Sequence, residues 1–310
     1  LRTTVNNRLR SSGAGGAAPV VPILGYAAAS GTGSPADRVL AAPAPEAADR
    51  WAVWGEGFGS WTRKDGNGNA ASVSENTGGF LIGADVAAFE ETRLGVFAGY
   101  SRTELNVAAR GSSASADSYH LGAYGGSSFA AGAGVLSLRG GASYSWSDIE
   151  SDRTVAVGAL VGAPTAGYRA GTAQVFGEAG WAFDMGPGTV EPFAGLAWVG
   201  LDTDGFTEAG GAAALAGQSQ DMSTAFTTLG ARGSASVGLG TLPLELTGAL
   251  GWRHAFGDVT PLTTASFAGG TPFTVAGAPI SRDAAFVEAG ASLSLNDSAR
   301  LSLGYSGQIA

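Results

Sequence analysis

Apolar and polar side chains alternate along much of the second half of the chain. The same period of two occurs in residues 173–183, 284–295 and 300–309. Because successive side chains of a β-strand point to opposite sides, the pattern predicts strands with one apolar and one polar face. In residues 242–254 the first face carries Leu242, Leu244, Leu246, Leu250 and Trp252, and the second carries Glu245, Thr247, Gly251 and Arg253.

Eleven strands are predicted, and the links that join them alternate between short and long. Tight turns at one end and long loops at the other are typical of an outer-membrane β-barrel. The strands are expected at residues 51–61, 77–88, 93–102, 117–129, 133–147, 169–184, 189–200, 221–237, 242–254, 282–295 and 300–309. Short links are expected near 89–92, 130–132, 185–188, 238–241 and 296–299, and long ones near 62–76, 103–116, 148–168, 201–220 and 255–281.

Composition favours the membrane interpretation. Hydrophobic residues make up 45% of the 310 residues and charged residues only 14%, yet no apolar run approaches the roughly 18–20 residues of a membrane-spanning helix. A membrane protein without such helices has to close its backbone hydrogen bonds in a barrel. A soluble β-sandwich would also alternate, but apolar faces of about 9 to 12 residues per strand match a bilayer crossing.

Eleven is an odd number, whereas bacterial single-chain barrels use even numbers of strands. We therefore expect a transmembrane antiparallel β-barrel of about 12 strands, eleven of them in residues 51–310 and a closing strand missing from this sequence. The chain opens with neither Met nor a signal peptide. Because a barrel reaches the outer membrane through a secretion signal, a longer precursor is expected.

The first 50 residues have a different pattern. Leu1, Val5 and Leu9 recur every four residues beside Arg2, Asn6 and Arg10, which predicts an α-helix over residues 1–12. A helix of this length is marginal in water on its own, so it is expected inside the barrel lumen. Residues 13–50, rich in Ala, Gly and Pro, are predicted to be a flexible linker.

The lumen is the expected location of the functional contacts. The helix arginines, Arg2, Arg8 and Arg10, are expected to meet an acidic wall, since opposite charges attract more strongly in a partly dehydrated pore than at an open surface. In the alternative interpretation, these carboxylates pair with wall arginines such as Arg253 and Arg232. The carboxylates assigned to the wall are Glu56, Asp85, Glu178, Glu245 and Glu288.

Other function classes find little support. The chain has no cysteine, which excludes disulfides and cysteine-ligated metals, and its net charge of -9 argues against a nucleic-acid surface. His120 and His254 stand without a cluster of metal ligands, and Gly55, Gly57 and Gly59 lie in one strand with no following helix. We expect no cofactor and no metal.

Seven segments of the barrel region resemble a known family. A helix, a linker and about twelve strands together with these segments resemble the C-terminal translocator domain of type V autotransporters. The segments are WAVWGEGFGSW (51–61), GGFLIGAD (78–85), VFGEAGW (175–181), EPFAG (191–195), LGWRHAFGD (250–258), PISRDAAFVEAG (279–290) and LGYSGQ (303–308).

The resemblance implies a function in secretion across the bacterial outer membrane. It implies that the barrel inserts in that membrane with its helix in the pore, and that an upstream passenger is carried to the cell surface. The implied partners are the passenger, outer-membrane lipid and lipopolysaccharide, the barrel assembly machinery and periplasmic chaperones, and the barrel is expected to be a monomer. A final strand ending in an aromatic residue follows the LGYSGQ-like segment in that family and is missing here.

Asn6 and Asn7 are the residues that suggest chemistry. The Asn6 side-chain nitrogen could attack its own backbone carbonyl and release the downstream chain, if a lumen carboxylate polarises the amide. Residues 5–7 (VNN) resemble the cleavage site on the lumen helix of the serine protease autotransporters of enteric bacteria. In the alternative interpretation, this pair makes structural hydrogen bonds, and the chain is not an enzyme.

Two other functions are alternatives. A passive porin would use the same barrel without a role for the helix. A phospholipase-like hydrolase in the barrel wall would need a serine and a histidine, but the chain has two histidines and no G-x-S-x-G motif.

Overall fold

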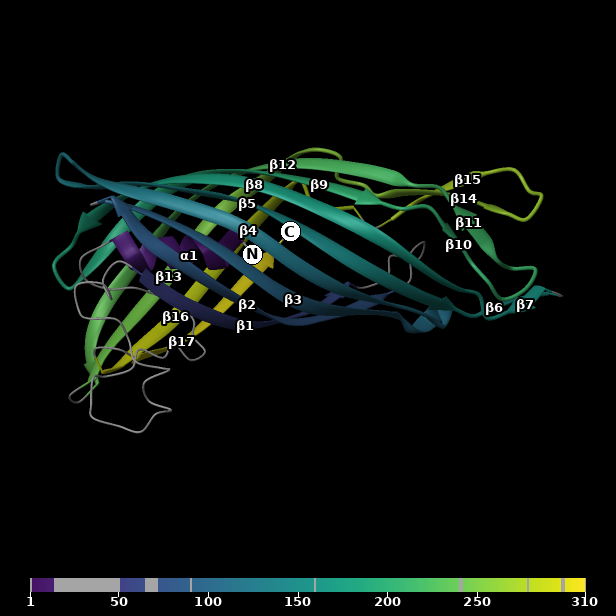
Figure 1. Ribbon diagram of the computed structural model, residues 1–310, viewed down its shortest axis with the longest axis horizontal. Helices are drawn as coiled ribbons and strands as arrows, with labels where there is room; N and C mark the ends of the chain where they lie inside the picture. The colour runs from purple at the N-terminus through teal and green to yellow at the C-terminus, as the bar shows by residue number, and fades with distance from the viewer. Residues whose placement is uncertain are drawn as a thin grey trace, which may run out of the picture.

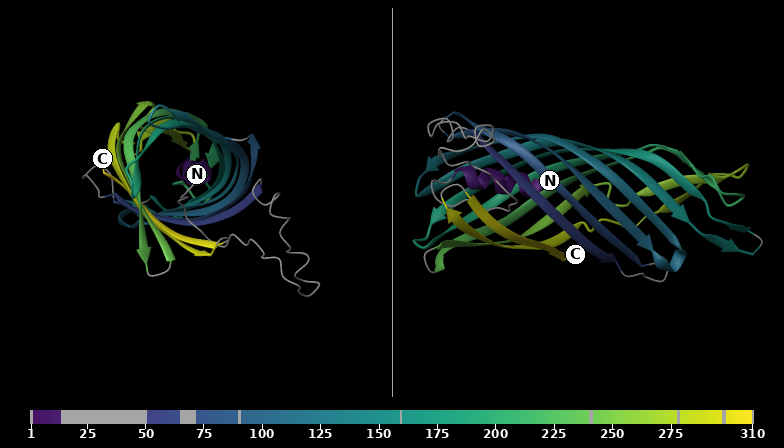
Figure 2. Two further views of the ribbon diagram at one scale, coloured as in Figure 1. Left: turned by 90° about the vertical axis from the view of Figure 1, so that its left-hand side faces the viewer. Right: turned by 60° about the horizontal axis from the view of Figure 1, so that its bottom comes forward.

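Eleven long antiparallel strands form one sheet that curls around a central space (Figures 1 and 2). The computed structural model describes residues 2–13, 51–64, 72–89, 91–158, 160–239, 242–277, 279–296 and 299–309. The strands are β1 (Trp51–Lys64), β2 (Val73–Phe89), β3 (Thr92–Val107), β4 (Ser112–Ala131), β5 (Gly134–Arg153), β8 (Thr165–Asp184), β9 (Gly188–Thr203), β12 (Gln220–Leu239), β13 (Leu242–Gly257), β16 (Asp283–Asn296) and β17 (Ala299–Ile309).

Each strand of this sheet pairs with the next one along the chain, so the prediction of an all-β antiparallel barrel wall is confirmed. Within the described ranges, β1 and β17 form the two ends of the strand order and do not pair with each other. No described helix is both long enough and apolar enough to cross a membrane.

The links follow the expected rhythm with one correction. Two or three residues join β2 to β3, β4 to β5, β8 to β9, β12 to β13 and β16 to β17. The prediction of a long link at 103–116 is wrong, because β3 reaches Val107 and β4 begins at Ser112. A short 3-10 helix, η1 (Ala108–Arg110), lies between them. The ladder continues there through pairs such as Thr103 with Ala116. Strands that rise out of a bilayer become polar on both faces, so loss of the apolar face does not end them.

Three of the long links carry strands of their own. The link after β5 forms a two-stranded hairpin, and the links after β9 and β13 together form a four-stranded sheet at the far end of the barrel (Figure 1). These stretches were expected to be long links without strands, and that expectation is wrong. The added strands are β6 (Val155–Val157), β7 (Leu160–Gly162), β10 (Phe206–Thr207), β11 (Leu215–Gly217), β14 (Leu262–Phe267) and β15 (Phe273–Ala276).

The outer surface of the wall is apolar and aromatic. Phe80, Tyr100, Tyr119 and Trp146 are successive cross-strand partners on β2 to β5, and the rings of Tyr100 and Tyr119 lie 5.6 Å apart. Two residues nearer the long links, the outward side chains are charged, and Arg102 donates to Asp117 at 2.9 Å. This change from rings to charges is the pattern of a barrel at the edge of the hydrocarbon layer.

One helix, α1 (Arg2–Gly13), lies inside the ring of strands (Figure 2, left). It occupies the half of the barrel that carries the short turns (Figure 1). The expected lumen helix is therefore present, with bounds one residue later than expected at each end. The linker expected at 13–50 falls, apart from Gly13, outside the described residues.

Candidate functional site

The apolar side of α1 packs on the inner wall. Val5 and Leu9, four residues apart and thus on one helical face, are buried with Leu81 of β2, Phe97 of β3 and Tyr124 of β4. A Cβ on Gly126 would meet Leu9 Cδ2 at 3.3 Å, so this glycine lets the helix approach β4. The helix is thereby held by burial of apolar surface as well as by its charges.

On the same side, Asp85 is enclosed by three donors. Arg8 of the helix donates to its two oxygens at 2.6 and 3.0 Å, Arg93 donates at 2.5 Å, and the Tyr124 hydroxyl donates at 2.8 Å. Trp54 Nε1 in turn donates to the Tyr124 hydroxyl at 2.6 Å. The Asp85 side chain has no solvent exposure (0%), so its charge is stabilised by these groups.

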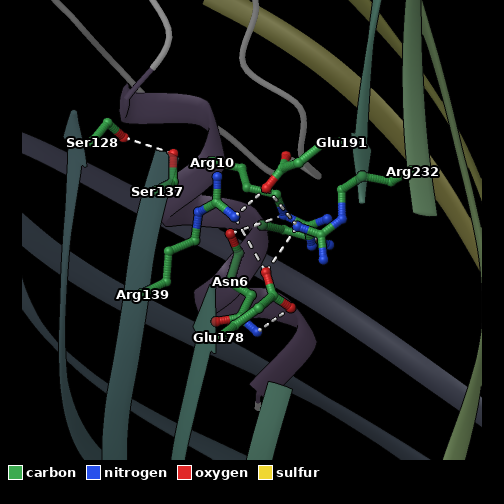
Figure 3. A network of polar contacts seen from close by, with 9 residues as sticks. Asn6, Arg10, Ser128, Ser137, Arg139, Glu178, Glu191 and Arg232 are labelled. Carbon is green, nitrogen blue, oxygen red and sulfur yellow. Dashed lines mark hydrogen bonds and ion pairs between the residues drawn. The ribbon is translucent and has the colours of Figure 1, made fainter. Parts of the chain in front are cut away.

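A second network lies on the other side of the helix (Figure 3). Glu178 accepts from Arg232 at 2.8 Å and from Arg139 at 3.2 Å, and Arg139 also donates to Glu191 at 2.7 Å. Asn6 Nδ2 of the helix donates to Glu178 Oε2 at 3.3 Å. The Asn6 amide thus links the helix to a row of ion pairs between side chains of the wall.

Arg10 directs its guanidinium at its own helix. Its Nε donates to the backbone oxygen of Asn6 at 3.1 Å, and its Nη2 donates to Asn7 Oδ1. The carbonyl of the peptide bond between Asn6 and Asn7 therefore accepts a hydrogen bond from a cation, which polarises it.

The remaining predicted residues lie at different places on the wall. Glu56 of β1 interacts with Thr4 of the helix. Arg2 and Glu288 line a cavity between helix and wall, and Arg253 in the same cavity donates to Gln308 at 3.3 Å. Glu245 is buried on β13, where its cross-strand partner is Ser292.

Three functional residues were missed by sequence reasoning: Arg93, Arg139 and Glu191. Arg93 follows Asp85 across a tight turn that pairs Ala87 with Arg93, so hairpin register could have placed both side chains on one face. The pairing of Arg139 with Glu178 is a direct cross-strand match between β5 and β8. The sequence does not predict this match, because a long link separates β5 from β8 and leaves the register between the two strands undetermined.

The two histidines have polar neighbours. His120 contacts the hydroxyls of Ser101 and Ser145 at 2.9 and 2.7 Å with its two ring nitrogens, and His254 Nδ1 lies 2.7 Å from Asp283. In the part of the chain that the structure describes, no three His, Asp or Glu residues gather as a metal site would require.

A sequence model of the autotransporter beta-domain matches residues 53–306. The chain belongs to this family. Two extracellular serine proteases of Serratia marcescens are 39% and 38% identical to this autotransporter domain over 263 residues, which is 84% of its length. The chain spans about a quarter of those relatives, 25% of each.

Solved structures of autotransporter translocators share the fold. The translocator domain of NalP from Neisseria meningitidis has a TM-score of 0.57 at 17% identity, and it is matched over 84% of this chain and 81% of that one. The transport unit of AIDA-I from Escherichia coli scores 0.60 at 16% identity, with 84% of each chain covered. The β-domain of the Bordetella autotransporter BrkA scores 0.58 at 18% identity, with 84% and 93% covered.

Proposed function

We propose that this chain is the translocator of an autotransporter, a barrel in the bacterial outer membrane that carries an upstream passenger to the cell surface and then holds the connecting helix in its pore. The observation that supports this most directly is the pairing of Arg8 with the enclosed Asp85. A segment of the same polypeptide is bound inside the wall, as expected of a chain that has passed through it. The proposed partners are the passenger, lipid and lipopolysaccharide, the barrel assembly machinery and periplasmic chaperones.

The test follows the passenger in the full-length precursor. An epitope-tagged passenger upstream of Leu1 should become accessible to protease added to intact Gram-negative cells, while the same precursor without residues 51–309 should keep its tag protected. A passenger that stays protected although the barrel fractionates with the outer membrane would contradict the proposal. The porin and hydrolase alternatives gain no support from the comparisons.

A second candidate function is self-cleavage between Asn6 and Asn7, favoured by the contacts at that bond. We propose that Asn6 Nδ2 attacks the Asn6 carbonyl carbon and gives one proton to Glu178, 3.3 Å away. Arg10 stabilises negative charge on the carbonyl oxygen. The new N–C bond closes a five-membered imide on the upstream fragment. The bond to the Asn7 nitrogen breaks, and this nitrogen takes the proton held by Glu178 and leaves as a free amine.

Mass spectrometry of the assembled domain tests this reaction. The mature barrel should begin at Asn7, and Asn6→Gln should leave the precursor uncut because the longer side chain cannot close the five-membered ring. Glu178→Gln should slow cleavage by about 10²- to 10⁴-fold, the usual contribution of a general base. Asn76→Gln, at an exposed position of β2, is the matched control. An intact bond between Asn6 and Asn7 after complete assembly would exclude the reaction, while surface display of the passenger would be unaffected.

A further inference from the structure

A cavity of about 40 Å³ lies between α1 and the wall formed by β8, β9, β12, β13 and β16. We call it the lumen cavity. Water needs roughly 10–15 Å³ of such volume per molecule, so the space suits about three small occupants. Its charged lining consists of Arg2, Arg10, Arg232, Arg253, Glu178 and Glu288.

The lumen cavity has an excess of positive charge. Four arginines and two glutamates line it, a difference of two positive charges. Glu178 is already engaged by Arg139 and Arg232. Arg10 donates to its own helix, and Arg253 donates to the neutral Gln308. An uncompensated cation in a poorly hydrated interior is costly, so the space favours a negative occupant.

Buried polar atoms without a protein partner lie around the same space. Among the described residues these are Asn6 Oδ1, Thr228 Oγ1, Arg232 Nε and Arg253 Nε, and all four residues line the lumen cavity. Asn6 and Thr228 are 6% and 7% exposed, so bulk solvent does not satisfy them. Leaving such a buried group unpaired is energetically costly.

The chemistry of these atoms specifies what they bind. Two guanidinium N–H groups and a hydroxyl can donate, whereas Asn6 Oδ1 can only accept. The Asn6 orientation is fixed because Glu178 accepts from its Nδ2. The guanidinium groups of Arg232 and Arg253 lie over the rings of Phe193 and Phe286, at 3.7 and 5.8 Å from the ring centres. Three donors in one small cavity suit a small anion, and the lone acceptor suits a water.

We propose that the lumen cavity binds one small inorganic anion of the halide class together with about two waters. The anion bridges the helix arginines, Arg2 and Arg10, to the wall arginines, Arg232 and Arg253, and so fastens the helix in the barrel. Arg2 and Asn6 belong to this site, so it is complete only while the bond between Asn6 and Asn7 is intact. It predicts that the folded domain is stabilised by halide at constant ionic strength.

The experiment uses the uncut domain, with residues 1–6 still attached, in detergent and in crystals. Crystals soaked in sodium bromide should show an anomalous bromine peak in the lumen cavity, and replacing sodium gluconate with sodium bromide at equal ionic strength should raise Tm in a saturable way. Arg253→Gln should remove both effects. Arg169→Gln, at a side chain that is 80% exposed on the outer surface, should keep both.

A second, less disruptive variant keeps the test valid if Arg253→Gln fails to fold. Thr228→Val keeps the side-chain shape, and it should weaken the bromide dependence of Tm at least several-fold without removing the barrel. The proposal is overturned if the cavity contains waters without an anomalous signal. It is also overturned if halide stabilises Arg253→Gln and Thr228→Val as much as the unmodified domain.

Discussion

The Asp85 carboxylate shows how single residues fix the helix in the pore. It is fully enclosed, and Arg8, Arg93 and Tyr124 together satisfy it. A buried ion pair is weak support for net stability, because desolvation offsets the attraction. Removing only the carboxylate is still costly, because its arginine partners stay buried and charged. The network therefore fixes the position of the helix, and loss of one of its members destabilises the fold.

Asp85→Asn tests this at the residue scale. The change removes the buried negative charge that Arg8 and Arg93 face, and we expect a loss of about 3–5 kcal/mol in the free energy of unfolding, measured by denaturant titration in detergent. Asp148→Asn breaks an exposed pair with Arg169, in which the side chains are 63% and 80% exposed, and it should cost about 0–1 kcal/mol. Equal losses in the two variants would show that the enclosed pair contributes no more than an exposed one.

Gly95 makes room for this network. A Cβ at this position would lie 2.6 Å from the Tyr124 hydroxyl oxygen and 2.7 Å from Asp85 Cβ. Gly95→Ala should therefore push Tyr124 away from the carboxylate and destabilise the fold by about 1–3 kcal/mol. Gly78→Ala is the matched control, since a Cβ there meets nothing within 4 Å. The shift of the thermal transition in detergent gives the comparison, and equal shifts would contradict the steric argument.

At the scale of elements, a charged contact joins the four-stranded sheet of β10, β11, β14 and β15 to the barrel. Arg153 at the end of β5 donates to the two oxygens of Glu208 at 2.6 and 2.5 Å, and to the Ala213 oxygen at 2.7 Å. Glu208 also accepts from the Leu215 nitrogen at 2.8 Å. The Glu208 carboxylate thus connects the link after β9 to Arg153 of the barrel wall and to Leu215 further along the same link.

Glu208→Gln should loosen this link. The amide keeps the size of the side chain but loses the charge and one acceptor, so protease added to intact cells should cut residues 204–219 several times faster. Glu104→Gln removes a longer and more exposed contact with Arg102, at 3.4 Å, and should leave the cutting rate unchanged. Unchanged cutting in Glu208→Gln would mean that the strand pairing alone holds the sheet.

The same scale shows what alternation can and cannot predict. Period-two patterning located all eleven wall strands because one face of each meets lipid, as the exposure of Leu250 and Trp252 illustrates. It missed β6, β7, β10, β11, β14 and β15, because short strands outside a membrane have no lipid face to repeat. The pairing of β11 with β14 joins residues about 50 positions apart, such as Leu215 with Phe267, and sequence alone does not specify that contact.

At the scale of the whole molecule, the sequence predicts the contacts inside the lumen only in part. The sequence supplied which groups carry charge and which face of each strand they occupy, and this was enough to expect arginines of the helix against carboxylates of the wall. It did not supply how far the helix is inserted. That depth decides that Arg8 meets Asp85 while Arg10 turns back to its own helix, and it depends on packing of Val5 and Leu9 against residues from three strands.

The helix should control passage through the barrel. An α-helix with side chains is about 10–12 Å wide, and α1 is bound on one side by Asp85 and on the other by the Glu178 network. Deleting residues 2–13 from the uncut domain should therefore raise its single-channel conductance several-fold in planar bilayers. Asp85→Asn, which loosens one side only, should give brief openings above the closed level. Equal conductance with and without the helix would mean that α1 does not obstruct the pore, and the barrel would then be better described as an open channel.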